Sequence, residues 1–255
     1  MEGWGDEALA ESLRAVRARM AAASARAGRP AAETRLIAVT KTVPAERLLA
    51  ALALGLRVFG ENRVQEAHDK HARLAQLAGA DPQAARLLTD VRWELIGHLQ
   101  TNKAARALGL FARVQSVDSL RLAEALSARA EALGRTLPIL LEVNIGQEES
   151  KSGFAPDAPE LIAAARAIAA LPGLQAEGLM TVAPITERPE QARPFFRGLR
   201  ALRDQLRAEA PLGEDGGWPE LSMGMTDDFE VAIEEGATSI RVGRGLFGAR
   251  PALHG

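Results

Sequence analysis

The chain of 255 residues contains no cysteine and no tyrosine. Without a thiol, disulfides, thiolate metal sites and cysteine nucleophiles are excluded. Without a phenol, any mechanism that needs a tyrosine as general acid or base is excluded as well. The formal net charge of −2 provides no bulk attraction to nucleic acid or to an anionic membrane surface, so we expect neither as a partner.

Long apolar segments are also missing. The N-terminal stretch MEGWGDEALAESLRAVRARM lacks the apolar core of a signal peptide, and no run approaches the ~20 apolar residues of a membrane span. We therefore expect a cytoplasmic protein without a membrane partner. His68 and His71 fall with Lys70 on a polar helical pattern; the two histidines are expected to be solvated, and their spacing predicts no metal site.

Lysine is scarce: of 31 basic residues, the lysines are Lys41, Lys70, Lys103 and Lys151, and the others are arginine. A position that keeps lysine in such a chain can indicate a need for an amine that loses its proton and acts as a nucleophile. Lys41 stands directly after LIAVT (36–40), an apolar run that ends in the β-branched residues Val39 and Thr40 and is typical of a strand buried on both faces. Lys41 therefore lies where a buried strand leaves the core.

Strand-like and helical segments alternate along the chain. The apolar runs typical of strands lie near 36–41, 57–61, 92–98, 113–117, 138–144, 176–182, 220–224 and 238–243, and helical periodicity fills most of the intervals. This order predicts an α/β fold, a single (β/α)₈ TIM barrel, with a doubly wound open sheet as the alternative. We expect one domain over 1–255, made of an extra N-terminal helix (1–30) that could cover the bottom of the barrel, the barrel itself (31–250) and a tail (251–255).

The predicted strands are mostly followed by polar or ionisable residues. In a barrel, the carboxyl ends of the strands form the mouth that carries the chemistry. At this mouth desolvation would lower the pKa of the Lys41 amine, and a neutral amine can attack an aldehyde to form a Schiff base. An ion pair of Lys41 with Glu61 or Asp118 is the alternative.

The seventh and eighth strands lead into the stretches LSMGMTDDFEVAIEEG and SIRVGRGLFG, whose glycines allow an anion to approach the backbone. We expect the N–H groups of 222–225 and of 243–244 to bind phosphate, with Asp227 and Asp228 pointing aside. The alternative is ordinary turn chemistry with Thr226 as a helix cap. A phosphate site and an amine at one mouth suggest a phosphorylated aldehyde, and pyridoxal 5′-phosphate (PLP) meets both requirements.

Seven motifs, in order from about Leu36 to Arg250, resemble those of the pyridoxal phosphate homeostasis proteins. They are AVTKTVP, FGENRVQEA, WELIGHLQTNK, VQSVDS, EVNIGQEESKSGF, GLMTVAP and LSMGMTDDFEVAIEEGATSIRVGRGLFG. The resemblance implies a single PLP-binding barrel similar to the N-terminal domain of bacterial alanine racemase.

The resemblance also implies roles for individual residues. Lys41 resembles the lysine that forms the Schiff base with PLP, and Arg241 resembles the arginine that faces the pyridine nitrogen. Asn62 and His98 lie on motifs near the cofactor mouth. The residues that resemble the phosphate-binding loops are Ser222, Met223, Gly224, Gly243 and Arg244. Arg244 departs from the family pattern, in which a small hydroxyl residue is frequent.

Two functions of different classes remain. The first is a non-catalytic protein, with no catalytic residue of its own, that stores, buffers or delivers PLP, with apo PLP-dependent enzymes as potential recipients. The second is a PLP-dependent amino-acid racemase or related fold-type III enzyme. An alanine-type racemase resembles this chain in the arginine but pairs a lysine with a tyrosine as its two bases, and this chain has no tyrosine. We therefore expect the carrier, without excluding residual racemase-like activity. A phosphosugar-type barrel enzyme fits the general pattern but not the motifs, and the lack of a second apolar stripe favours a monomer.

Overall fold

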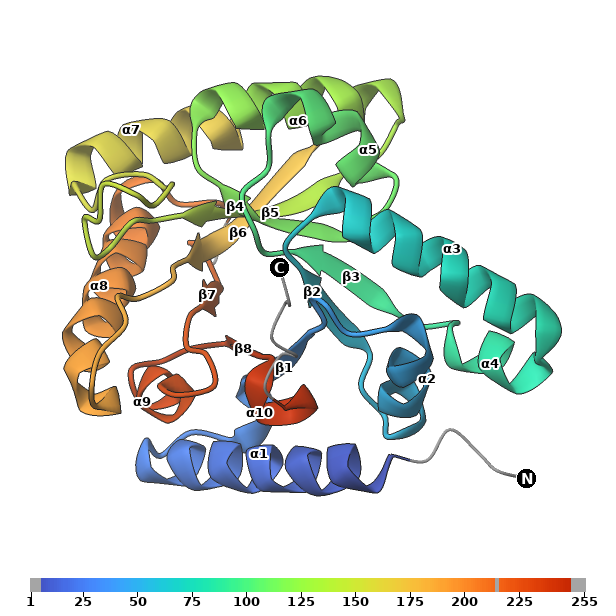
Figure 1. The fold of residues 1–255 in the computed structure, drawn as a ribbon. Helices are drawn as coiled ribbons and strands as arrows, with labels where there is room; N and C mark the ends of the chain where they lie inside the picture. The colour runs from blue at the N-terminus through green and yellow to red at the C-terminus, as the bar shows by residue number, and fades with distance from the viewer. Residues whose placement is uncertain (1–5, 214–215, 249–255) are drawn as a thin grey trace.

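The computed structural model describes residues 6–213 and 216–248, and its centre is a closed barrel of eight parallel strands in sequential order (Figure 1). The strands are β1 (Arg35–Val39), β2 (Val58–Glu61), β3 (Arg92–Leu95), β4 (Arg113–Val117), β5 (Leu137–Glu142), β6 (Leu174–Met180), β7 (Glu220–Ser222) and β8 (Ser239–Val242). β1 pairs with both β2 and β8, which closes the barrel. The predicted (β/α)₈ barrel is confirmed, and the open sheet is excluded.

Helices surround this barrel. Those that follow the strands are α2 (Ala45–Ala53), α3 (Val64–Ala80), α4 (Pro82–Leu87), α5 (Ala104–Leu108), α6 (Leu120–Ala132), α7 (Ala158–Ala169), α8 (Arg193–Glu209), α9 (Phe229–Glu234) and α10 (Arg244–Phe247). Short 3₁₀ turns are η1 (Ala31–Glu33), η2 (Thr101–Lys103) and η3 (Pro189–Ala192). The apolar core lies between the strands and this outer ring, as in other barrels of this class.

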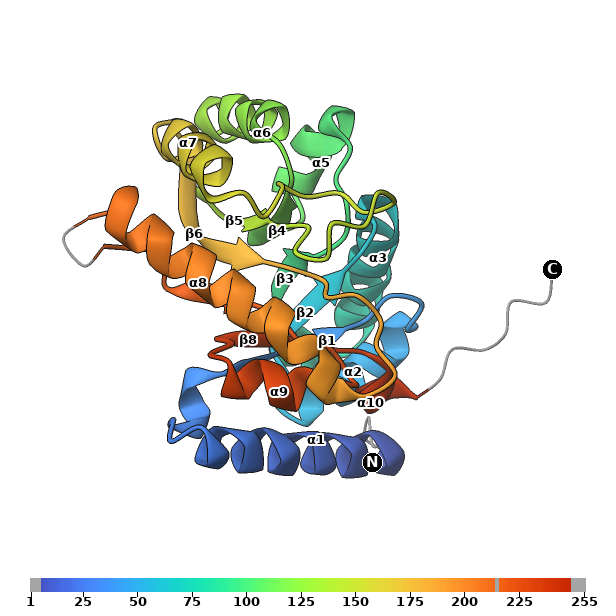
Figure 2. The ribbon, with the colours of Figure 1, turned by 90° about the vertical axis from the view of Figure 1, so that its left-hand side faces the viewer.

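The N-terminal helix α1 (Glu7–Arg26) begins after Asp6, whose carboxylate accepts the Leu9 N–H at 2.9 Å. Its buried face follows the spacing of Leu9, Leu13 and Val16. Both views place α1 along the outside of the barrel, next to α9 and α10 (Figures 1 and 2). The expectation that α1 covers the bottom of the barrel is wrong. In the described part of the chain, the eighth strand is followed by the single turn α10, and α1 packs beside it in the outer ring.

The interior of the barrel is charged at its lower end, where the strands begin. Arg35 and Arg113, at the starts of β1 and β4, both contact Glu220 at the start of β7, at 3.4 and 3.6 Å. Arg113 also pairs with Glu177 of β6. Burial raises the pKa of Glu177, and Arg113 opposes that shift. This network closes the barrel at the end opposite the strand exits.

Within the described part of the chain, no helix is long and apolar enough to cross a membrane. The predicted tail, 251–255, lies outside the described residues.

Candidate functional site

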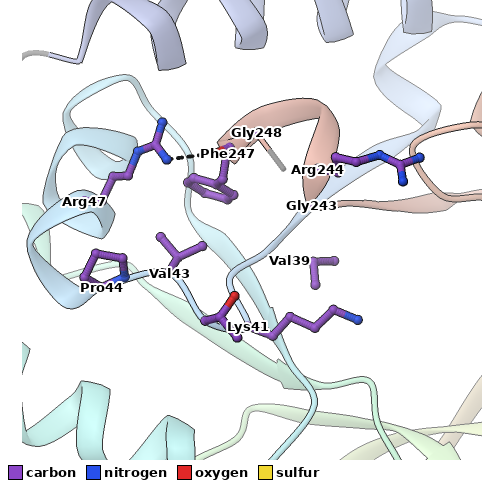
Figure 3. A pocket seen from close by; sticks show the side chains of 10 residues that line it. Val39, Lys41, Val43, Pro44, Arg47, Gly243, Arg244, Phe247 and Gly248 are labelled. Atoms are coloured by element: carbon purple, nitrogen blue, oxygen red, sulfur yellow. Dashed lines mark hydrogen bonds between the residues drawn. The ribbon is translucent and has the colours of Figure 1, made fainter. Parts of the chain in front are cut away.

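Lys41 lies just beyond the end of β1, half-buried, in a cavity of about 530 Å³ at the mouth of the barrel (Figure 3). Because β1 and β8 are neighbours, with Ala38 opposite Val242, the residues after both strands meet here. Gly243, Arg244 and Arg47 line the same cavity. Its volume falls in the range of ~300–1,000 Å³ typical of small-molecule sites. The structure therefore brings together the predicted amine and the predicted glycine turn.

Arg244 neutralises one of the two aspartates that we expected to disfavour an anion. Its guanidinium donates to the carboxylate of Asp227, and both side chains are exposed. The carboxylate of Asp228 accepts the Met225 N–H at 2.6 Å, and burial raises its pKa. Both carboxylates thus have partners at the rim. Arg244 turns its guanidinium outward, away from Phe247, in Figure 3.

The turns after β7 and β8 are bound to each other. The Gly245 N–H donates to Thr226 Oγ1 at 3.2 Å, and α9 begins only at Phe229, so the alternative in which Thr226 caps the helix is wrong. Gly224 has φ +91°, and a Cβ there would lie 2.5 Å from the Ala232 Cβ. A Cβ on Gly243 would lie 3.3 Å from the Val39 carbonyl oxygen. Both turns therefore pack closely against their neighbours.

Several groups of the predicted phosphate loop have partners inside the protein. The Met223 N–H donates to the Ser239 carbonyl at 3.1 Å, and Met225 is bound to Asp228 as described. Ser222 is fully buried, and its hydroxyl donates to Gln115 Oε1 at 2.6 Å. These contacts direct Ser222 into the barrel, so a phosphate contact by Ser222 or Met223 stays a prediction.

Arg241 is the upper end of a hydrogen-bond chain through the barrel. Its Nη1 donates to Ser222 Oγ and its Nη2 to the Thr181 carbonyl, each at 2.6 Å. Gln115 continues the chain by donating to Glu94, the acid that lies near Arg35 and Arg113 at the lower end. Burial lowers the pKa of Arg241 to about 10, a shift that Glu142 and Asp228 oppose. Arg241 is therefore a fixed buried cation at neutral pH.

Glu142 ends β5 and carries a carboxylate oxygen without a hydrogen-bond partner in the described chain, Oε2, which is buried. Burial raises its pKa to about 7, Asp118 adds to the shift, and Arg241 opposes it. Glu142 therefore changes protonation near neutral pH. The sequence did not reveal Glu142, because a position at the end of β5 predicts a strand residue but does not show how deeply its carboxylate is buried.

His98 belongs to a neighbouring depression rather than to the Lys41 cavity. Its Nδ1 lies 2.8 Å from an Asp118 carboxylate oxygen and 3.2 Å from Ser152 Oγ. Both contacts use the same ring nitrogen, so the three residues do not form a catalytic triad, which needs one partner on each nitrogen. Asn62 follows β2, and its backbone lies close to Gly97. A Cβ added to Gly97 would be 2.5 Å from the Asn62 carbonyl oxygen. A cofactor contact by Asn62 or His98 stays a prediction.

Two side chains on the polar pattern of α3 pack against neighbouring strands, and one of them, His71, was expected to be solvated. Lys70 is buried, and its amine donates to the Thr40 carbonyl, to Glu61 at 2.6 Å and to Glu66 at 2.7 Å. His71 packs on Trp93 with ring centres 4.5 Å apart, and burial lowers its pKa. The expectation was wrong because α3 lies against β2 and β3, which covers a face that reads as polar. His68 is exposed, as expected.

Arg47 lines the Lys41 cavity, and it is a second residue that the sequence pattern did not single out. It donates to the Phe247 carbonyl at 2.7 Å and to Asp6 at 2.8 Å, so it joins α2, α10 and the start of α1 (Figure 3). Its helical position predicts only an outward charge. Among the described residues, no group of three acidic or histidine side chains is placed to hold a metal ion.

A closed barrel with a lysine after its first strand and a glycine turn after its last defines a class of proteins. Similarity to known protein families and solved structures identifies this class. The sequence profile of the alanine racemase N-terminal domain matches residues 12–251. The chain is 41% identical over 240 residues to the pyridoxal phosphate homeostasis protein of Aquifex aeolicus, covering 94% of this chain and 97% of that one. It is 43% identical over 243 residues to the protein of the same name from Pseudomonas aeruginosa, covering 95% and 96%.

A solved structure agrees with these relatives. PipY of Synechococcus elongatus, determined with PLP bound, has a TM-score of 0.75 and 35% identity, with 94% of this chain and 100% of PipY covered. The chain belongs to the alanine racemase N-terminal domain family and, within it, to the pyridoxal phosphate homeostasis proteins. The resemblance that the motifs indicated is confirmed.

Proposed function

We propose that this protein binds PLP at the mouth of the barrel and holds it as a Schiff base on Lys41. The observation that carries the proposal is that Lys41, Gly243 and Arg244, from opposite ends of the sequence, line one cavity. The family relationship, and PLP in the related PipY structure, support the choice of ligand.

The residues of the site fit this ligand. Arg47 and Arg244 line the cavity that would receive a dianionic phosphate, and each is ion-paired, with Asp6 and with Asp227, so either could exchange its carboxylate for the phosphate. Gly243 allows close approach of the backbone. Arg241 is a buried cation within the same barrel, and its guanidinium would donate to the pyridine nitrogen of PLP only while that nitrogen is unprotonated. We retain Ser222, Met223 and Gly224 as predicted members of the cofactor loop, and Asn62 and His98 as predicted neighbours of the mouth.

The attachment is a condensation. The neutral Nζ of Lys41 adds to the aldehyde carbon, the aldehyde oxygen leaves as water, and a C=N bond remains. Bound PLP supplies an electron sink for amino-acid chemistry, but a racemase of the alanine type also needs a second base on the opposite face. The tyrosine that serves there is absent from this chain. We therefore propose a carrier that stores, buffers or delivers PLP in the cytoplasm as a monomer, with apo PLP-dependent enzymes as recipients.

The test begins with the absorption of the purified protein after addition of PLP. We expect a Schiff-base band, and borohydride reduction followed by peptide mass spectrometry should place the adduct on Lys41. Lys41→Ala should fold and lose the adduct, whereas Lys103→Ala should keep it. An adduct that persists in Lys41→Ala refutes the assignment.

The racemase alternative is tested with the same loaded protein. Turnover of an L-amino acid to its D form at a rate typical of enzymes, about 1 s⁻¹ or more, would refute the carrier. Transfer is tested separately, in buffer that contains a scavenger of free PLP. PLP from the loaded protein should reach an apo-enzyme faster than PLP that was first released into this buffer.

A further inference from the structure

The backbone around Lys41 is bound by charged side chains of the next βα unit. Lys70 of α3 donates from Nζ to the Thr40 carbonyl, the group that precedes Lys41. Glu66, one turn earlier on α3, accepts the N–H of Thr42, the residue that follows Lys41, at 2.5 Å. The peptide groups on both sides of Lys41 are therefore hydrogen-bonded to α3.

A third residue joins these contacts into one cluster. Glu61 at the end of β2 accepts from the Thr40 hydroxyl and from Lys70, each at 2.6 Å. Lys70 also contacts Glu66 at 2.7 Å. Thr40 and Glu61 are fully buried, and the Lys70 side chain is 9% exposed. Hydrogen bonds to charged groups in such surroundings are about twice as strong as neutral ones.

The backbone after Lys41 needs this support. Thr42 has φ +64°, a left-handed conformation that is costly for a β-branched residue. Such a conformation persists only where its surroundings hold it in place. The Thr42 N–H is bound to Glu66, so the contact acts on the strained residue itself. Strain next to the predicted attachment point indicates that the direction of the Lys41 side chain is under constraint.

We propose that Lys70 and Glu66 are positioning residues for Lys41: they fix its two peptide groups and so set the direction in which its amine enters the cavity. This inference rests on the proposed function of Lys41. It also gives a reason for lysine at position 70, because the compact ammonium is bound by the carbonyl and two carboxylates together, which the planar fork of arginine does not fit.

Glu66→Ala is the main test variant, because the Glu66 side chain is 27% exposed. Its removal leaves no buried charge unpaired, since Lys70 keeps its ion pair with Glu61. The matched control is Glu46→Ala, which breaks another α3 ion pair, Arg73–Glu46 at 2.7 Å. Glu66→Gln keeps an acceptor for the Thr42 N–H and serves as the conservative rescue. Lys70→Met would leave Glu61 buried without its cation, so it is secondary to these variants.

The first measurement is the rate of PLP attachment to Lys41, followed by borohydride trapping and peptide mass spectrometry on folded protein. We expect Glu66→Ala to slow attachment at least tenfold, Glu66→Gln to recover most of the rate, and Glu46→Ala to stay within twofold of wild type. An unchanged rate in Glu66→Ala, or an equal loss in Glu46→Ala, overturns the inference.

The second measurement does not need PLP. Limited acetylation of the unloaded protein labels only four lysines and the N-terminus, so the ratio of Lys41 to Lys103 labelling is readily measured. A released Lys41 should react with this small reagent at least threefold faster in Glu66→Ala, while attachment of PLP becomes slower. A purely structural role would lower stability without moving this ratio. If wild type fails to attach PLP at Lys41, the proposed function fails, and an unchanged labelling ratio would separately overturn the positioning role.

Discussion

Arg241 Nη1 donates to Ser222 Oγ over 2.6 Å, and both residues are buried, on the neighbouring strands β8 and β7. Ser222 donates in turn to Gln115, which donates to Glu94. The buried Arg241 cation is therefore oriented by a chain that runs down the interior of the barrel to its charged lower end. Through this chain, a residue far from the cavity can affect the group expected to face the cofactor.

Ser222→Ala should destabilise the protein by about 2 kcal/mol, because Arg241 and Gln115 each lose a buried partner. We also expect weaker PLP binding, since among the described side-chain hydrogen bonds of the Arg241 guanidinium the one to the Thr181 carbonyl then remains. Urea unfolding and a PLP titration measure the two effects.

Ser239→Ala is the matched control for Ser222→Ala. Ser239 lies opposite Ser222 on β8, is equally buried, and has a hydroxyl without a hydrogen-bond partner among the described residues. Its removal should change the free energy of unfolding by less than about 1 kcal/mol. Equal losses in both variants would contradict a specific role for the Arg241 chain.

Asp227→Asn should tighten PLP binding about two- to fivefold, because the exposed Arg244 then loses its competing carboxylate and can face the phosphate. Arg244→Ala should weaken binding by a similar factor. Neither change should cost more than about 1 kcal/mol of stability, since the ion pair is at the surface. Titrations at low and at high salt check the cause, because both effects should shrink with ionic strength. Weaker binding in Asp227→Asn, tighter binding in Arg244→Ala, or an effect independent of salt would rule out this electrostatic account.

Gly224→Ala should be far more destabilising than Gly55→Ala. Both glycines have left-handed backbones, with φ +91° and +85°, so each variant pays conformational strain of about 1–2 kcal/mol. Only at Gly224 would the new methyl group meet the Ala232 Cβ, at 2.5 Å, whereas nothing lies within 4 Å at Gly55. Thermal unfolding of the two variants measures the difference, and similar melting temperatures would show that the turn after β7 is not as closely packed as described.

The positions of the strands could be predicted because each is a short apolar run that ends at a polar residue. The exits at Lys41 and Gly243 meet because β1 and β8 are neighbours, which follows from closure of the barrel alone. The orientation of a side chain at an exit was harder to predict. Ser222 and Met223 read as one glycine turn with Gly224, but the pleat directs the Ser222 hydroxyl inward to Gln115.

The cluster around Lys70 shows what periodicity leaves out. Glu66 and Lys70 are four residues apart, which predicts an ion pair on a helix surface. The sequence pattern does not show that α3 buries this pair against β1 and β2, where Glu61 and the Thr40 carbonyl meet the ammonium. Burial there depends on contacts between segments that are distant in sequence, so only the folded chain reveals it.

Glu142 should make the protein less stable as the pH rises through neutrality. The folded state raises the pKa of this carboxyl from its ordinary value of 4.5 to about 7, so between these values the folded protein holds a proton that the unfolded chain has lost. The stabilisation is complete below about pH 4.5 and is lost as the pH rises through 7. Its full size is about 3 kcal/mol.

The Glu142→Gln variant has no group that titrates at this position. Its free energy of unfolding should therefore increase relative to that of wild type between pH 4.5 and 8. Asp118→Asn should lower the pKa of Glu142 and move the wild-type decline to lower pH, because Asp118 contributes to the shift. Urea unfolding across this range measures all three proteins, and parallel curves for wild type and Glu142→Gln would show that Glu142 is ionised in the folded protein like an exposed carboxylate.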